Sequence, residues 1–152
     1  MSQFFCLGDR LVRLVARLAW LPPLLARLTL AGVFIESGWG KLHNIPKVVV
    51  FFTSLGLFVP EFQAHLVAIT EFGCGILLLI GLLTRLASFP LLITMTVAIA
   101  TAKREDLHGL TDLFGFSEYL YIVLFVWLIV AGAGPISLDH LLLKQANRPS
   151  RS

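Results

Sequence analysis

Residues 63–103 read QAHLVAITEFGCGILLLIGLLTRLASFPLLITMTVAIATAK, two long apolar stretches separated by a short turn at Thr84 and Arg85. Each stretch is close to the roughly 20 apolar residues that a helix needs to cross a bilayer. A connection this short makes the two helices antiparallel neighbours. This part of the chain therefore predicts a transmembrane helical hairpin.

Apolar stretches of similar length precede and follow this hairpin. The four transmembrane helices that we expect are Leu24–His43, Gln63–Leu83, Arg85–Lys103 and Ser117–Gly134. The composition agrees, because 57% of the 152 residues are hydrophobic and only 14% are charged, against about 45–50% and about 25% in soluble domains. So small a domain cannot bury this much apolar surface, and lipid must cover the remainder. The sequence predicts an all-α membrane protein, a four-transmembrane-helix bundle.

The segment before the first span is amphipathic. Within residues 7–20 the basic side chains share one side of a helix and apolar side chains lean to the other: Arg10, Arg13 and Arg17 against Leu7, Leu11, Val15 and Leu18. This pattern predicts an N-terminal basic helix that lies on the cytoplasmic leaflet. A cytoplasmic extension of the first span is the alternative, but Pro22-Pro23 favours a break between the two.

A second short segment follows the first span. The apolar run Val48–Phe52 is too short to span and is predicted to lie in the membrane interface or to re-enter. We therefore divide the chain into three parts. These are an interfacial amphipathic segment over residues 1–21, a four-helix membrane domain over residues 22–143, and a cytoplasmic polar tail over residues 144–152.

The distribution of lysine and arginine predicts the orientation of the bundle. One side carries seven of these residues and the other carries four; the richer side holds Arg10, Arg13, Arg17, Arg85, Lys144, Arg148 and Arg151. Basic residues are enriched on the cytoplasmic side of membranes, so we expect a multi-pass protein of the cell (inner) membrane with both termini in the cytoplasm. The same asymmetry explains the net charge of +3, and no nucleic acid is expected among the partners.

Two acids fall inside the predicted spans. Glu36 and Glu71 lie at about the same depth because their spans run in opposite directions. The helical line Thr29, Gly32, Glu36, Gly40 and His43 is expected to face another helix, since small residues allow close approach. Two close carboxylates repel, so one needs a proton or a cation, supplied by Arg27 or Lys41. These four residues form the predicted ligand or proton site; the alternative is that they only fix the helix pairing.

A second group of polar residues is predicted at the outer rim. It holds Lys103, Glu118 and His43. The alternative for Lys103 and Glu118 is anchoring in the interface, and the alternative for His43 is a solvated interfacial histidine without a ligand. The four histidines are scattered, and Cys6 and Cys74 form no C-x-x-C pair, so the sequence contains no haem or metal motif. No catalytic constellation and no nucleotide-binding loop is present either.

Several short motifs, in a specific order and spacing, point to a known family. They run from Arg27 through Phe34–Leu42 (FIESGWGKL), Phe51-Phe52 with Leu55-Gly56 and Pro60, Glu71–Gly75 (EFGCG), Gly81–Arg85 (GLLTR) and Glu118 to Gly134–Asp139 (GPISLD). In these residues the chain resembles the DoxX family of small membrane proteins. The departures are Cys74, where the family often has glycine, and Ile136, which replaces a polar residue.

The resemblance implies a four-span protein associated with redox complexes, such as a subunit of a quinol oxidase or of a thiosulfate:quinone oxidoreductase. We expect a membrane subunit of a respiratory or thiol/oxidative-stress system rather than a complete enzyme. Its site for a quinone or another small amphiphile would lie near the two intramembrane carboxylates. The alternatives are a small proton-coupled transporter and a ligand-free scaffold for a partner enzyme. The expected partners are the lipid bilayer and a membrane redox protein, and a homo-oligomer is left open.

Overall fold

The computed structural model describes residues 16–104 and 106–146, in which the chain forms helices and turns and no strand. The four long helices are α2 (Leu21–His43), α4 (Pro60–Ile80), α5 (Thr84–Thr101) and α7 (Ser117–Ala131). Three shorter helices are α3 (Ile45–Ser54), α6 (Leu110–Gly115) and α8 (Leu138–Ala146). The predicted all-α architecture is confirmed.

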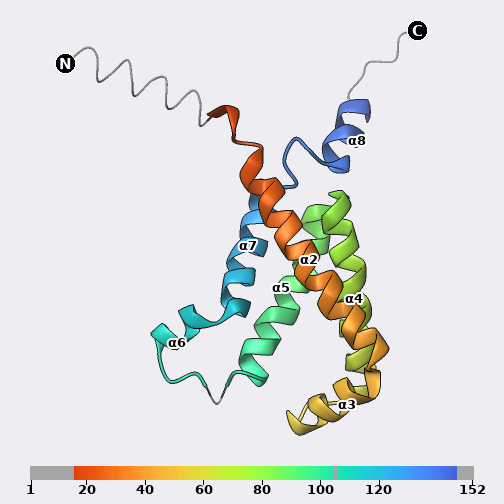
Figure 1. The fold of residues 1–152 in the computed structure, drawn as a ribbon, viewed down its shortest axis with the longest axis vertical. Coiled ribbons are helices and arrows are strands. Elements are labelled where there is room, and N and C mark those ends of the chain that lie inside the picture. The colour runs from red at the N-terminus through yellow and green to blue at the C-terminus, as the bar shows by residue number, and fades with distance from the viewer. Residues whose placement is uncertain (1–15, 105, 147–152) are drawn as a thin grey trace, which may run out of the picture.

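The long helices form two antiparallel pairs, α2 with α4 and α5 with α7. Figure 1 shows the pairs close together where α2 begins and apart at the other end. The buried residues follow this shape, since those of α5 stop at Leu91 and those of α7 are Phe125 and Leu128 in its second half. We call the closed end, where α2 and α5 begin, the capped end, and the end that carries α3 and α6 the open end.

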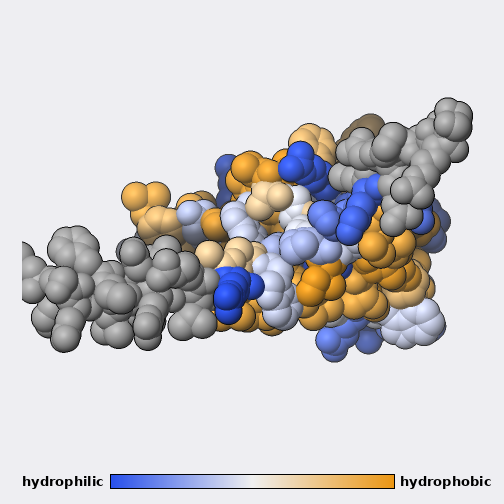
Figure 2. Space-filling model, turned by 90° about the horizontal axis from the view of Figure 1, so that it is seen from above, coloured by the Kyte–Doolittle hydropathy of each residue, from blue (hydrophilic) through white to orange (hydrophobic). Residues whose placement is uncertain are grey.

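The surface of the bundle is strongly apolar. Figure 2 shows hydrophobic residues over much of the face that it presents. Two helices, α4 and α5, are long and apolar enough to cross a membrane, and only 28% of each apolar window is buried inside the bundle. That burial is too low for core helices of a soluble protein. Helix α2 is longer but carries Arg27, Glu36 and Lys41, and the 15 residues of α7 extend about 22 Å.

Four helix ends differ by three residues from the predicted boundaries, and two of them belong to α4, which runs from Pro60 to Ile80 instead of from Gln63 to Leu83. Helix α2 begins at Leu21 instead of Leu24, because prolines are tolerated in a first turn, and residues 18–20 form a turn before it. Helix α7 ends at Ala131 instead of Gly134, because Gly132 takes a left-handed φ of +85°. Most of the predicted amphipathic helix over residues 7–20 lies outside the described residues. Helices α6 and α8 were not predicted.

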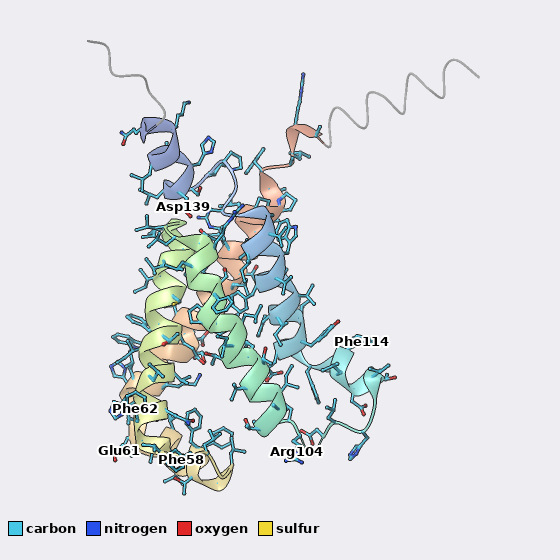
Figure 3. All side chains as sticks on the ribbon, turned by 180° about the vertical axis from the view of Figure 1, so that it is seen from behind. Phe58, Glu61, Phe62, Arg104, Phe114 and Asp139 are labelled. Carbon is cyan, nitrogen blue, oxygen red and sulfur yellow. The ribbon has the colours of Figure 1, made fainter. Side chains whose placement is uncertain are left out.

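Helix α3 corresponds to the short apolar segment predicted after the first span. Its 10 residues extend about 15 Å, too little to cross a bilayer. Figure 1 shows α3 turned across the end of the α2–α4 pair. Val50 and Phe51 on α3 are exposed, as are Phe58 in the following loop and Phe62 in the first turn of α4. Figure 3 shows Phe58 and Phe62 together at the open end.

The capped end is held by the guanidinium group of Arg27, which is 2% exposed. This group donates to the carbonyl oxygens of Leu78 and Leu79 in the last turn of α4, at 3.0 and 3.3 Å. It also donates to those of Ala133 and Ile136 after α7, both at 2.8 Å. Carbonyls at a helix C-terminus lack partners in their own helix and favour a cation. One side chain of α2 thus joins the ends of α4 and α7.

Asp139 makes the complementary contact at the same end (Figure 3). Its carboxylate accepts hydrogen bonds from the N–H groups of Leu83 and Thr84, at 2.7 and 3.0 Å, where α5 begins. Its own N–H donates to the carbonyl oxygen of Gly81 at 3.0 Å. A carboxylate at a helix N-terminus satisfies donors that have no partner in the helix. The segment after α7 is therefore fixed to the turn between α4 and α5.

Helices α2 and α4 cross at two glycines. The backbone of Phe72 lies so close to Gly38 that a Cβ atom on Gly38 would clash with it. A Cβ atom on Gly75 would lie 2.9 Å from Cγ1 of Ile35. Only glycine permits this separation of the two backbones. The crossing determines how near side chains of α2 come to those of α4.

We predict that Gly38→Ala destabilises the protein by about 1–3 kcal/mol, because the new methyl group must push α4 away. Gly73→Ala is the matched control, since nothing lies within 4 Å of a Cβ atom at Gly73 of α4, and it should be neutral or slightly stabilising. Unfolding midpoints of the two purified variants in one detergent give the comparison. Equal midpoints would contradict the close crossing.

We also predict that Asp139→Ala lowers the free energy of unfolding by about 1–3 kcal/mol, because two N–H groups lose their acceptor. The control is Asp106→Ala. Asp106 is exposed, and among the described residues its side chain makes only a 4.0 Å ion pair with Lys103. Such surface pairs contribute at most about 1 kcal/mol. Thermal unfolding of the two variants in detergent measures the difference. A loss no greater for Asp139→Ala than for Asp106→Ala would rule out the capping role.

Candidate functional site

An ion pair joins α2 and α4 in the half of the bundle nearer the open end. The Nζ atom of Lys41 lies 2.5 Å from Oε2 of Glu71. Ser37, one turn before Lys41 on α2, donates its hydroxyl to the same Oε2 at 2.9 Å. Lys41 also donates to the Ser37 hydroxyl oxygen at 2.7 Å. Ser37, Lys41 and Glu71 form the candidate site.

The glycine crossing explains why these three side chains meet. Gly38 follows Ser37 directly and lies against Phe72, the residue after Glu71. Because α2 and α4 are close here, the side chains of the two helices reach one another, and residues four apart on α2 share one face. Sequence reasoning predicted Glu71 and Lys41 but missed Ser37. The four-residue spacing from Ser37 to Lys41 was the signal that could have found it.

The two charged groups differ in exposure. The side chain of Glu71 is 1% exposed and that of Lys41 is 27% exposed. A buried carboxylate is costly unless a cation and hydrogen bonds accompany it, and here both are present. The ammonium group has three N–H donors, and the described residues accept two of them. The partly exposed Lys41 can therefore offer a donor to a ligand without giving up Glu71.

Glu36 does not join Glu71, and the expectation that the two carboxylates share one inward position is corrected. Glu36 is exposed and makes no hydrogen bond or ion pair within residues 16–104 and 106–146. Its helical line, predicted to face another helix of the bundle, is exposed throughout: Thr29, Gly32, Glu36, Gly40 and His43. The inward face of α2 holds Leu30, Phe34 and Gly38 instead, since Phe34 fills the core against Tyr121 and Phe125.

Arg27, the other predicted cation, lies at the capped end. Four hydrogen bonds to backbone carbonyls occupy its guanidinium group. It therefore holds helix ends together and does not neutralise Glu36 or Glu71. Of the four residues predicted for the ligand or proton site, the structure brings together Lys41 and Glu71.

The three residues predicted for an outer-rim site have separate surroundings. Lys103 lies 4.0 Å from Asp106 and 5.6 Å from the centre of the Phe116 ring. Glu118 accepts a 3.4 Å hydrogen bond from Ser117. His43 stacks on Trp39 at 4.1 Å and bonds the Trp39 carbonyl oxygen. Among the described residues no hydrogen bond or ion pair joins the three, and no three His, Cys, Asp or Glu side chains gather as a metal site requires.

The arrangement has a defined chemical capacity. An ammonium group can donate to a carbonyl oxygen and stabilise negative charge that develops on it. A carboxylate and a hydroxyl beside it can pass a proton over hydrogen-bond distances. The apolar surroundings strengthen both effects, because charges interact more strongly where water is scarce.

Comparison of the sequence with known proteins shows which family the chain is similar to. A DoxX family model matches residues 23–104, which include Ser37, Lys41 and Glu71. Inner membrane protein YqjF of Escherichia coli is 31% identical over 80% of this chain and 92% of its own. Uncharacterized membrane protein Rv3486 of Mycobacterium tuberculosis is 35% identical over 79% and 80%. "Putative oxidoreductase CatD" of Bacillus subtilis is 29% identical over 80% and 87%. No solved structure was found to match.

The family model covers more than half of the 152 residues. Two of these relatives exceed 30% identity over about four fifths of the chain. This chain belongs to the DoxX family of membrane proteins.

Proposed function

We propose that this protein is an inner-membrane subunit of a redox system that binds a quinone, or a similar carbonyl-bearing amphiphile, at Lys41, Ser37 and Glu71. The observation that carries the proposal is the asymmetric ion pair. Glu71 is almost completely buried, whereas Lys41 remains partly exposed with a donor to spare. A pair that served only to join two helices would have no need of an accessible member.

The proposed membrane arrangement has four spans, α2, α4, α5 and α7, with the capped end in the cytoplasm. It is supported by the apolar, largely unburied surfaces of α4 and α5 and by the basic residues Arg85 and Lys144 near the capped end. Helices α3 and α6 would then lie in the outer interface. Exposed apolar side chains on the segments at that end suit this location: Val50, Phe51, Phe58, Phe62, Leu110 and Phe114.

Each site residue has a distinct part in the proposed binding. The Lys41 ammonium would hold a carbonyl oxygen of the head group and stabilise the charge that builds up on it as electrons arrive. Ser37 would orient Lys41, since it bonds both charged partners. Glu71 would exchange the proton that accompanies the electron. The electrons would come from a partner redox protein.

Support for a redox association comes from the family and from one relative. The printed name of the Bacillus subtilis relative is "Putative oxidoreductase CatD". The apolar exterior suits an amphiphilic ligand, because a quinone tail can stay in lipid while the head group reaches the site.

We predict that Glu71→Gln yields a folded protein that fails to restore redox fitness to a deletion strain. Glutamine can keep the hydrogen bond from Ser37 but has neither the charge nor the exchangeable proton. Glu61→Gln, an exposed acid in the first turn of the same helix, is the matched control and should complement fully. Growth under oxidant and thiol stress is the measurement, with the amount of protein in the membrane measured in parallel. Full complementation by Glu71→Gln would leave the pair with a structural role alone.

We predict the orientation from the same arrangement. In a variant in which Cys6 and Cys74 are replaced by serine, a cysteine at Gln145 should be shielded from a membrane-impermeant thiol reagent in intact cells. A cysteine at Gly109 should react under the same conditions. Permeabilised cells serve as the control and should label both. The reverse pattern in intact cells would place the capped end outside and overturn the orientation.

A further inference from the structure

Glu36 is a carboxyl group that the fold leaves without a partner at membrane depth. It lies past the middle of α2, on the face opposite Phe34 and Gly38. In the four-span arrangement proposed above, on which this inference rests, that face meets lipid. An ionisable group in hydrocarbon is unfavourable unless it finds a hydrogen-bonding partner. Within residues 16–104 and 106–146 the chain supplies none.

The surface around Glu36 is shaped for close contact with another helix. Gly32 and Gly40 stand four residues before and four after it, and a Cβ atom on either would meet nothing within 4 Å. Gly38 and Gly75, in contrast, already lie in the contact between α2 and α4. Small residues spaced by four allow two helix backbones in a membrane to approach closely. Leu28 and Trp39, both exposed, flank this stripe with apolar bulk.

We propose that this outward face of α2 is the interface of a homodimer in which Glu36 meets Glu36 of a second copy. All copies inserted in one orientation share the direction of α2. A two-fold axis must then run along the membrane normal, which makes the two α2 helices parallel and brings equal depths together. One carboxyl in its acid form donates to the other, so a single residue type satisfies both partners. Gly32 and Gly40 then contact the same two glycines of the second copy.

A second copy fits this face better than lipid or an unrelated helix. Lipid tails offer no hydrogen-bond partner to a carboxyl group. An unrelated helix would need a polar side chain at the matching depth and a small surface beside it. A second copy of this chain supplies both the polar side chain and the small surface. The spacing of Gly32 and Gly40, four residues on either side of Glu36, also suits an isologous contact.

Cross-linking in native membranes and counting in liposomes test the proposal on the full-length protein. In a variant with Cys6 and Cys74 replaced by serine, Thr29→Cys on the proposed interface should form a disulfide-linked dimer under mild oxidation. Val97→Cys, on the exposed face of α5, is the matched control and should stay monomeric. Single-molecule photobleaching in phosphatidylcholine–phosphatidylglycerol vesicles should show two copies together for the unmodified protein.

Variants of the face should change the dimer in a graded way. Gly32→Leu with Gly40→Leu should abolish it, whereas Gly73→Leu, on an equally open glycine of α4, should not. Glu36→Leu should weaken association roughly threefold to twentyfold, the range of single hydrogen bonds between membrane helices. Glu36→Gln should retain most of it, because an amide also pairs with its own copy.

Several results would overturn the proposal. These are a monomer at every protein density, a dimer that survives Gly32→Leu with Gly40→Leu, equal cross-linking at Val97→Cys, and a Thr29→Cys cross-link to a different protein only. None of these bears on the site at Lys41 and Glu71, which complementation judges separately. Labelling of Thr29→Cys by an impermeant reagent would instead show that α2 is not in the bilayer. That result would overturn both the membrane arrangement and the dimer.

Discussion

The fold depends on how the carbonyl groups at the ends of α4 and α7 are satisfied. At the capped end, the guanidinium group of Arg27 donates hydrogen bonds to the carbonyl oxygens of Leu78, in the last turn of α4, and of Ala133 and Ile136, in the segment after α7. Because arginine presents several donors in a fixed plane, one residue can serve two helix ends at once. Asp139 does the reverse for the start of α5. A cation and an anion thus close one end of the bundle through helix termini and not through a salt bridge to each other.

The closed end has a consequence for the rest of the bundle. The buried residues of α5 and α7 are concentrated there, and the two helix pairs diverge towards the other end (Figure 1). The α2–α4 crossing, tightened by Gly38 and Gly75, stays close. The ion pair of Lys41 and Glu71 lies on this crossing. A rigid end and a fixed crossing therefore hold a charged pair in a half of the molecule where α5 and α7 are less buried.

The sequence predicted the long helices well because helix length and apolarity carry their own signal. The hairpin of α4 and α5 was read from one short turn, and Lys41 and Glu71 were singled out as ionisable groups in apolar stretches. Other features depend on the tertiary structure. The four carbonyl partners of Arg27 come from residues more than fifty positions away in the chain. No local sequence pattern predicts these contacts. The start of α2 depends on whether Pro22 and Pro23 lie in its first turn, and the end of α7 depends on the backbone conformation of Gly132.

The position of Glu36 could not be read from the sequence for a deeper reason. Helical spacing defines lines along α2 but not the direction in which each line points. In a soluble protein, hydrophobicity would decide, because water lies on one side only. In a membrane, lipid is as apolar as the core, so the apolar residues of α2 do not reveal which side of the helix faces inwards, and Glu36 itself is disfavoured in lipid. Shape decides instead. Phe34 fills space between Tyr121 and Phe125, and Gly38 admits α4. Glu36 is thereby turned outwards.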